Sequence, residues 1–203
     1  MGDTTEPDPW DEYADGWDDD PAARTYAEAA FASLVETLAR FGRTLDGLTV
    51  CDFGCGTGLL TERLADTAAR IDAVDTSPAM LARLATKAET HGWDHVRLST
   101  EVPESVRGHD LVVCSSVLSF VDDLQATTTR LAELLGDGGV FVQWDWEADP
   151  ADDEPHGLTR EAIRTALEGA GLVDVRVDTA FELPFEDMVM RPLIGVGRVV
   201  DRR

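Results

Sequence analysis

VCDFGCGTGLL, residues 50–60, places three glycines within five residues, directly behind a short apolar run. An apolar run followed by such a loop is typical of a buried strand that turns sharply onto a helix, where bare backbone can approach a ligand. Loops of this kind usually hold phosphate at the helix N-terminus, yet a carboxylate at Asp52 would repel a phosphate. The stretch therefore predicts an α/β fold and a ligand that tolerates Asp52.

The segments around this loop alternate between strand-like and helix-like patterns. We expect strands over residues 48–53, 70–75, 95–99, 109–116, 138–146 and 172–181, and helices over residues 22–41, 59–70, 77–92, 122–135 and 159–169. Ser77 before Pro78 and Thr159 before Glu161 are typical helix starts. Repeated strand–helix units with apolar strands predict a doubly wound parallel sheet with helices on both faces. Residues 188–200 predict an added antiparallel edge strand.

The charge of the chain limits its partners. Forty acidic residues face 17 basic ones, for a net charge of −23. Nucleic acids and anionic membranes are bound through basic residues, so we expect neither as a partner. The excess of acid indicates either a salt-rich cytoplasm, the explanation that we favour, or a coding bias towards Asp and Arg. An acidic N-terminus and the lack of a long apolar stretch predict a cytoplasmic protein.

Cysteine and histidine usage gives no sign of a metal site. Cys51, Cys55 and Cys114 form an odd, sparse set, which suits reduced thiols. No CxxC pair or nearby histidine accompanies them, so we expect no metal.

The distance from the loop to the next acid narrows the choice of ligand. Asp75 ends the second expected strand, 75 − 52 = 23 residues past Asp52, where it can take both hydroxyls of a ribose. That spacing also fits a nicotinamide dinucleotide. However, the third glycine comes too early for that fingerprint, and Asp52 would face the pyrophosphate. S-adenosylmethionine has a ribose and no phosphate, and it carries an ammonium and a sulfonium that suit Asp52.

The stretches 50–65 and 73–81, VCDFGCGTGLLTERLA and AVDTSPAML, resemble the class I S-adenosylmethionine-dependent methyltransferase family. Residues 109–123, 134–146 and 158–177 are similar to its later motifs, in family order. The resemblance covers about residues 48–179. It implies a Rossmann-like sheet of seven strands in the order 3-2-1-4-5-7-6, with the last strand antiparallel.

The resemblance also implies a cofactor site. Asp52 would contact the amino end of S-adenosylmethionine directly or through water, and Asp75 its ribose. The remaining implied contacts are Gly54, Cys55, Gly56, Thr57 and Gly58 along the methionine, Thr76, Met80, Thr100 and Glu101 around the adenine, and Cys114 and Ser115 under the methyl group.

The first 21 residues are acidic but carry Trp10, Tyr13 and Trp17, so we expect this leader to fold back onto the domain. Related enzymes close an N-terminal segment over the cofactor, which makes Tyr13 and Trp17 candidate contacts. We therefore divide the chain into residues 1–41, the leader and first helix acting as a lid, and residues 42–203, the methyltransferase domain.

The sequence says less about the methyl acceptor. We expect a small or medium-sized molecule, because little chain is left for a substrate domain. Many small-molecule members have His-His where this chain has Ser119 and Phe120, so that base is missing. The other candidates for taking a proton are Asp145, Glu147 and His156, and Trp144 or Trp146 could form a wall of the acceptor site. The missing base leaves a non-catalytic cofactor-binding protein as an alternative, and no feature indicates the oligomeric state.

Overall fold

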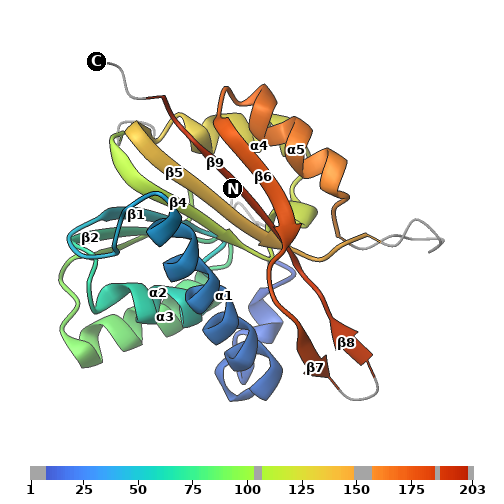
Figure 1. Ribbon diagram of the computed structural model, residues 1–203. Coiled ribbons are helices and arrows are strands. Elements are labelled where there is room, and N and C mark those ends of the chain that lie inside the picture. Colours follow the sequence, from blue (N-terminus) through green and yellow to red (C-terminus); the bar gives the residue numbers. More distant parts are fainter. Residues whose placement is uncertain (1–7, 103–106, 149–156, 186–187, 201–203) are drawn as a thin grey trace, which may run out of the picture.

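A computed structural model describes residues 8–102, 107–148, 157–185 and 188–200. Its centre is a seven-stranded sheet in the order β3-β2-β1-β4-β5-β9-β6 (Figure 1). The strands of the sheet are β1 (Thr49–Phe53), β2 (Arg70–Val74), β3 (Val96–Ser99), β4 (His109–Ser115), β5 (Leu135–Asp145), β6 (Val173–Thr179) and β9 (Leu193–Arg198). Strands β1 to β5 are parallel, and β9 is antiparallel to both β5 and β6.

Helices cover both faces of the sheet. They are α1 (Pro21–Arg40), α2 (Leu59–Ala65), α3 (Pro78–His91), α4 (Leu124–Ala132) and α5 (Arg160–Gly169), with single 3-10 turns at η1 (Asp11–Tyr13), η2 (Trp17–Asp19) and η3 (Leu118–Phe120). Helices α1, α2 and α3 lie on one face, and α4 and α5 lie on the other (Figure 1). The predicted doubly wound fold and its strand order are confirmed.

The expected edge strand over residues 188–200 is wrong in its position. Residues Met188–Met190 form β8, which pairs with β7 (Leu183–Phe185) in a separate hairpin. Strand β9 follows and inserts between β5 and β6, so β6 is the edge. The reason is burial: five of the six residues of β9 are buried, and a Cβ at Gly195 would clash with Ile163 of α5. Such a strand gains most when both of its edges are paired.

Side-chain caps fix the helix starts, as the sequence predicts for two of them. Ser77 Oγ accepts from the backbone N–H of Met80 at 3.1 Å, and Thr159 Oγ1 accepts from that of Ala162 at 3.1 Å. Helix α4 begins later than expected because Asp123 caps it. Each cap satisfies an amide that the helix leaves free.

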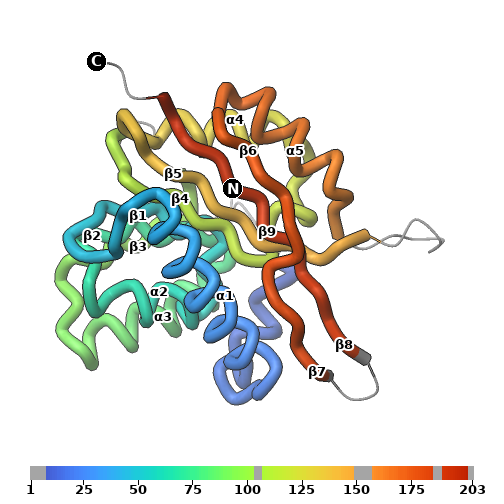
Figure 2. The backbone as a smooth tube through the Cα atoms, viewed as in Figure 1, coloured from blue at the N-terminus to red at the C-terminus, as the bar shows by residue number. Residues whose placement is uncertain are grey.

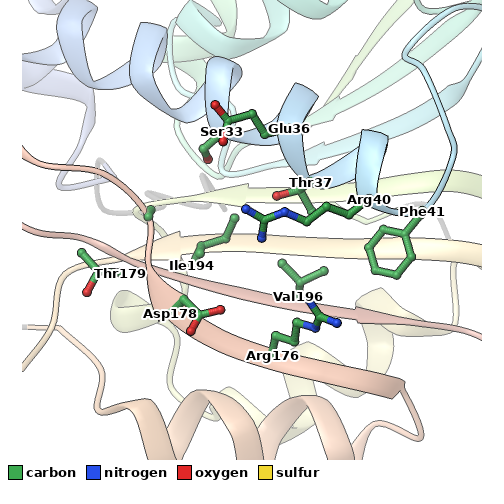
Figure 3. Close-up of a pocket in the computed structure, with 11 residues that line it drawn as sticks. Ser33, Glu36, Thr37, Arg40, Phe41, Arg176, Asp178, Thr179, Ile194 and Val196 are labelled. Carbon is green, nitrogen blue, oxygen red and sulfur yellow. The ribbon is translucent and has the colours of Figure 1, made fainter.

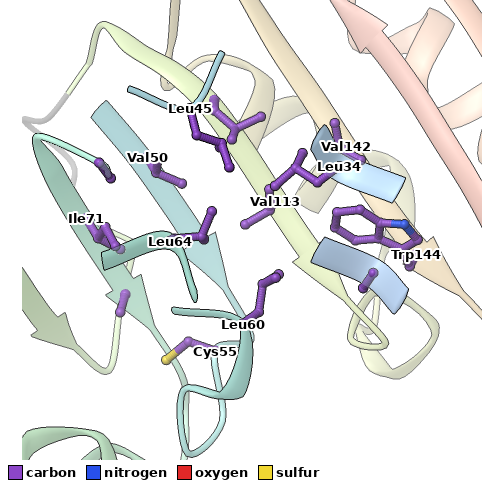
Figure 4. Packing of buried hydrophobic residues seen from close by; sticks show 14 of the residues in the cluster. Leu34, Leu45, Val50, Cys55, Leu60, Leu64, Ile71, Val113, Val142 and Trp144 are labelled. Carbon is purple, nitrogen blue, oxygen red and sulfur yellow. The ribbon is translucent and has the colours of Figure 1, made fainter. Parts of the chain in front are cut away.

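The core has two layers, one on each face of the sheet. On the α1 face, Leu34 packs beside the fully buried Trp144, whose Nε1 donates to Ser33 Oγ at 2.8 Å (Figure 4). On the other face, Phe141 and Ile163 are fully buried. Neighbouring residues of β5 thus serve opposite layers, as strand alternation requires. Helix α1 is part of this core. Among the described residues, no helix is long and apolar enough to cross a membrane.

Two further segments reach the carboxyl ends of the parallel strands. The described part of the leader, residues 8–20, and the β7–β8 hairpin both lie in the lower part of the view in Figure 2, beside the start of α1. In open α/β sheets this edge carries the ligand site.

Candidate active site

Each of the three glycines in the loop between β1 and α2 has a positive φ, a conformation that glycine adopts easily. Gly54 has a φ of +71°, its N–H donates to Val74 O at 2.7 Å, and a Cβ there would clash with the side chain of Val117. Gly56 has a φ of +54°, but a Cβ on it would meet nothing within 4 Å. The backbone at Gly56 therefore borders open space, as close approach of a ligand requires.

Asp75 follows β2 and binds this loop. Its Oδ2 accepts from the N–H of Gly56 at 2.7 Å, and its Oδ1 accepts from the N–H of Ser77 at 3.0 Å. Partial burial raises the pKa of Asp75, these two bonds oppose the rise, and the carboxylates of Asp8 and Asp11 add to it. The half-buried Asp75 thus joins the glycine loop to the start of α3.

Asp52 lies beneath the loop rather than on its surface. The residue is buried; its Oδ2 accepts from Thr61 Oγ1 at 2.6 Å, and its Oδ1 has no hydrogen-bond partner. Burial raises the pKa of Asp52 to about 7, against the hydrogen bond from Thr61, and the charge of Asp75 adds to the rise. A positive charge above the loop would stabilise the ionised form of this carboxyl group.

The leader docks on the start of α3 through Asp11. Its Oδ1 accepts from Ser77 Oγ at 2.6 Å and from the N–H of Ala79 at 3.3 Å. The carboxylate therefore sits at a helix N-terminus, where negative charge is favourable, and next to Asp75.

A second leader contact reaches the glycine loop itself. Asp18 Oδ1 accepts from Thr57 Oγ1 at 2.6 Å, and Asp18 Oδ2 lies 2.8 Å from Nζ of Lys87, the single lysine of the chain. Asp15 pairs with Arg83 on α3. These contacts hold the leader across the loop and α3.

Aromatic contacts hold the other end of the leader. Trp10 meets Phe120 of η3 edge-on, with ring centroids 5.1 Å apart, and meets Trp17 at 6.4 Å. Tyr13 is 54% exposed. Sequence reasoning named Tyr13 and Trp17 but missed Trp10, Asp11 and Asp18. The acidic, aromatic composition of the leader was a signal, but which of its residues make contacts depends on the tertiary fold.

The other predicted cofactor residues lie along the same edge of the sheet. Thr76, Thr100 and Glu101 are exposed after β2 and β3, whereas Met80 is buried in the first turn of α3. Cys114 is fully buried on β4, and Ser115 is half-buried at the end of that strand.

The residues predicted to border the methyl acceptor differ in their burial and in their partners. Asp145 is fully buried at the end of β5, and burial raises its pKa. Glu147 is exposed and paired with Arg160 at 2.8 Å, which makes it a surface ion pair. His156 lies outside the described residues. Of the two tryptophans, Trp144 is part of the core and Trp146 is half-buried.

The three cysteines near the loop and on the neighbouring strands are enclosed by the protein. Cys51, Cys55 and Cys114 are buried free thiols, and burial raises the pKa of each. Over the ranges that the structure describes, no group of three His, Cys, Asp or Glu side chains could hold a metal ion.

A groove of about 220 Å³ lies away from the glycine loop, between α1 and the strands β6 and β9. Figure 3 shows Arg40 from α1 and Arg176 from β6 on either side of it, with Val196 between them. Its lining includes no residue of the loop and none of the predicted cofactor contacts. The groove is therefore separate from the candidate active site.

Comparisons with known proteins agree with this fold. Residues 51–141 match a family of methyltransferase domains. The sequence is 34% identical over 162 residues to a probable non-canonical nonribosomal peptide synthetase, CymA, from Salinispora arenicola. The aligned region is 70% of this chain and 2% of CymA. The fold is similar to that of an S-adenosylmethionine-dependent methyltransferase from Clostridium acetobutylicum, with a TM-score of 0.72 and 19% identity over 95% of this chain and 100% of that one.

A second solved structure is the N-methyltransferase NodS from Bradyrhizobium japonicum with S-adenosyl-L-homocysteine, at a TM-score of 0.67 and 19% identity over 96% of this chain and 93% of that one. These structures show the fold. The strand order is that of the class I S-adenosylmethionine-dependent methyltransferase fold, and within it residues 51–141 match a family of methyltransferase domains. The aligned stretches span about half or less of the curated relatives' own lengths.

Proposed function

We propose that this protein transfers the methyl group of S-adenosylmethionine to a small or medium-sized acceptor. The observation that carries the proposal is the unit formed by Gly56 and Asp75: a backbone open to a ligand, bonded to a carboxylate at the carboxyl edge of the sheet. The unpartnered oxygen of Asp52 beneath the same loop adds a negative charge that suits the ammonium end of this cofactor. The relatives named as methyltransferases favour catalysis over a non-catalytic binding protein.

In this proposal the predicted residues keep their roles. Asp75 accepts hydrogen bonds from the ribose hydroxyls, and Asp52 stabilises the amino end by its charge or through water. The loop residues Gly54, Cys55, Gly56, Thr57 and Gly58 run along the methionine, Thr76, Met80, Thr100 and Glu101 border the adenine, and Cys114 and Ser115 lie under the methyl group.

The sulfonium supplies an activated methyl group, so the protein has mainly to position the acceptor. Holding two reactants in line can be equivalent to a local concentration of about 10⁵ M or more. The fixed loop and the buried strand ends provide a rigid frame for this.

The leader acts as the lid in this proposal: residues 8–20 lie over the site, whereas α1, which the prediction grouped with the lid as residues 1–41, packs into the core of residues 42–203. Asp11 and Asp18 support it, because both bind groups that border the cofactor site, Ser77 and Thr57. Tyr13 and Trp17 are the leader residues that contact the cofactor in this proposal. We also infer a cytoplasmic protein, since all three of its cysteines are free thiols.

Calorimetry with S-adenosylmethionine, S-adenosylhomocysteine and NADH tests the cofactor. We expect the first two to bind and NADH not to. Hydrogen bonds to a charged acceptor contribute about 1.5 to 3 kcal/mol each, so Asp75→Ala should weaken S-adenosylmethionine binding at least about tenfold. Asp137→Ala, an exposed change at the opposite end of β5, is the control. Unchanged affinity in Asp75→Ala would show that the cofactor assignment is wrong.

A further inference from the structure

The side chain of Tyr26 reaches from α1 across the ends of β4 and β5. Its ring lies between Trp146, at a centroid distance of 5.2 Å, and Phe181, at 5.3 Å. Burial raises the pKa of the Tyr26 hydroxyl, and Ser116, Asp145 and Ser115 are close enough to influence it as well. This places a polar group at the end of an aromatic wall, beside the end of β4.

Three buried hydroxyl groups in this region make no well-aligned hydrogen bond, although that of Tyr26 lies close to Ser116 and that of Ser119 lies close to Asp145. They are Tyr26 Oη, Ser116 Oγ and Ser119 Oγ. Buried hydroxyls without partners are costly, and a group of them at one place is explained when a ligand supplies the missing bonds. Ser116 also has a φ of +54°, an uncommon conformation for a serine. Strain of this kind gathers at binding and catalytic sites.

The carboxyl group of Asp145 lies in the same place and is held by backbone N–H groups, with the hydroxyl of Ser119 close by. Its Oδ2 accepts from the N–H of Ser119 and its Oδ1 from the N–H of Trp146, both at 3.2 Å. Among the residues that the structure describes, no basic side chain bonds to it. Two arginines that follow in the chain are engaged elsewhere, Arg160 with Glu147 and Arg191 with Glu182.

The charges along this edge select the acceptor. Asp52, Asp75 and Asp145 lie at or beside the carboxyl ends of β1, β2 and β5, in a chain of net charge −23. The charge of these three groups, where they are ionised, would repel an acceptor with a carboxylate. A cationic amine would be attracted to the protein as a whole, to Asp145, and to the faces of aromatic rings.

Resting on the proposed function, we propose that the methyl acceptor is an amine with an aromatic or similarly apolar body. Its nitrogen lies among Asp145, Tyr26, Ser116 and Ser119, and its body lies against Trp146 and Phe181. Asp145 is then a catalytic residue, because it touches the reacting nitrogen.

The proton balance of the step is simple. The ammonium form of the acceptor gives one proton to the carboxylate of Asp145, which frees the nitrogen lone pair. That lone pair forms the new bond to the methyl carbon, and the carbon–sulfur bond breaks with its electron pair going to sulfur. The product is a methylated ammonium ion, and the proton on Asp145 passes to water when the products leave.

Three probes that share a phenyl ring on a short chain but differ in charge test the proposal. The protein is saturated with S-adenosylhomocysteine, and 2-phenylethylamine, 2-phenylethanol and 3-phenylpropionate are titrated by calorimetry. We expect the amine to bind at least about tenfold more tightly than the alcohol, and the carboxylate not to bind. Methyl transfer, followed as S-adenosylhomocysteine release, should occur with the amine alone.

Two variants test whether Asp145 causes the preference for the amine. Asp145→Asn should weaken the amine at least about tenfold and leave the alcohol unchanged, whereas Asp137→Asn, the same change at the far end of β5, should alter neither. Equal binding of the three probes, preference for the carboxylate, or no binding of any of them to the loaded protein would overturn the amine assignment. If S-adenosylhomocysteine itself fails to bind, the proposed function is wrong.

Discussion

Asp52→Asn should change how the stability of this protein depends on pH. The buried carboxyl group keeps its proton up to about pH 7 in the folded protein but loses it near pH 3.8 when the chain unfolds. Between these values the folded state holds a proton that the unfolded state does not, so the free energy of unfolding falls as pH rises. The contribution is fully present below the lower value and is lost through about pH 7. Asparagine keeps the shape and can still accept from Thr61, but it does not titrate.

The size of the effect follows from the two pKa values. One pKa unit corresponds to about 1.36 kcal/mol, so the difference between 3.8 and about 7 is worth about 4 kcal/mol in full. Between about pH 5 and about pH 8, the range open to measurement, the wild type should lose about 3 kcal/mol relative to Asp52→Asn. All other titrating groups are shared by the two proteins, and their contributions largely cancel in the comparison.

Urea unfolding at several pH values and one ionic strength measures this difference. Asp137→Asn, which removes an exposed charge, should follow the wild type across the range. Parallel curves for the wild type and Asp52→Asn would refute the reasoning, because they would mean that the buried carboxyl group has an ordinary pKa. S-adenosylhomocysteine provides a second readout: its ammonium favours the ionised carboxyl, so its affinity should rise with pH through about 7 in the wild type only.

Three further predictions concern the loop, the leader and the surface charge. Gly54→Ala and Gly47→Ala both force alanine to a φ near +70°, which costs about 1 to 2 kcal/mol, but only the alanine at position 54 meets a side chain, that of Val117. We expect an extra loss of about 1 to 3 kcal/mol in chemical unfolding for Gly54→Ala, and equal losses would contradict the clash. Deleting residues 1–20 should weaken S-adenosylhomocysteine binding and leave the fold intact by circular dichroism; unchanged affinity by calorimetry would make the leader a tail without a lid function. The melting temperature should rise from low salt to molar KCl as salt screens the net charge of −23, and a flat or falling curve would argue against a salt-rich cytoplasm.

The sequence by itself determined the class of fold and predicted the glycine loop as the candidate ligand site. Apolar strands that alternate with capped helices allow few arrangements other than a doubly wound sheet, and Ser77 and Thr159 fixed two helix starts through local bonds. The glycine loop and Asp75 marked the carboxyl edge, because both the turn and the spacing are local properties of the chain.

Only the tertiary structure decided what depends on partners far apart in the sequence. The position of β9 between β5 and β6 follows from pairing and burial on both sides, which no local pattern records. The depth of Asp52 beneath the loop depends on packing around it, and so does its raised pKa. The preference for Asp145 over Glu147 as the residue that takes the proton also rests on the fold. The two acids are two residues apart, but Asp145 is enclosed by the protein, whereas Glu147 pairs with Arg160 at the surface.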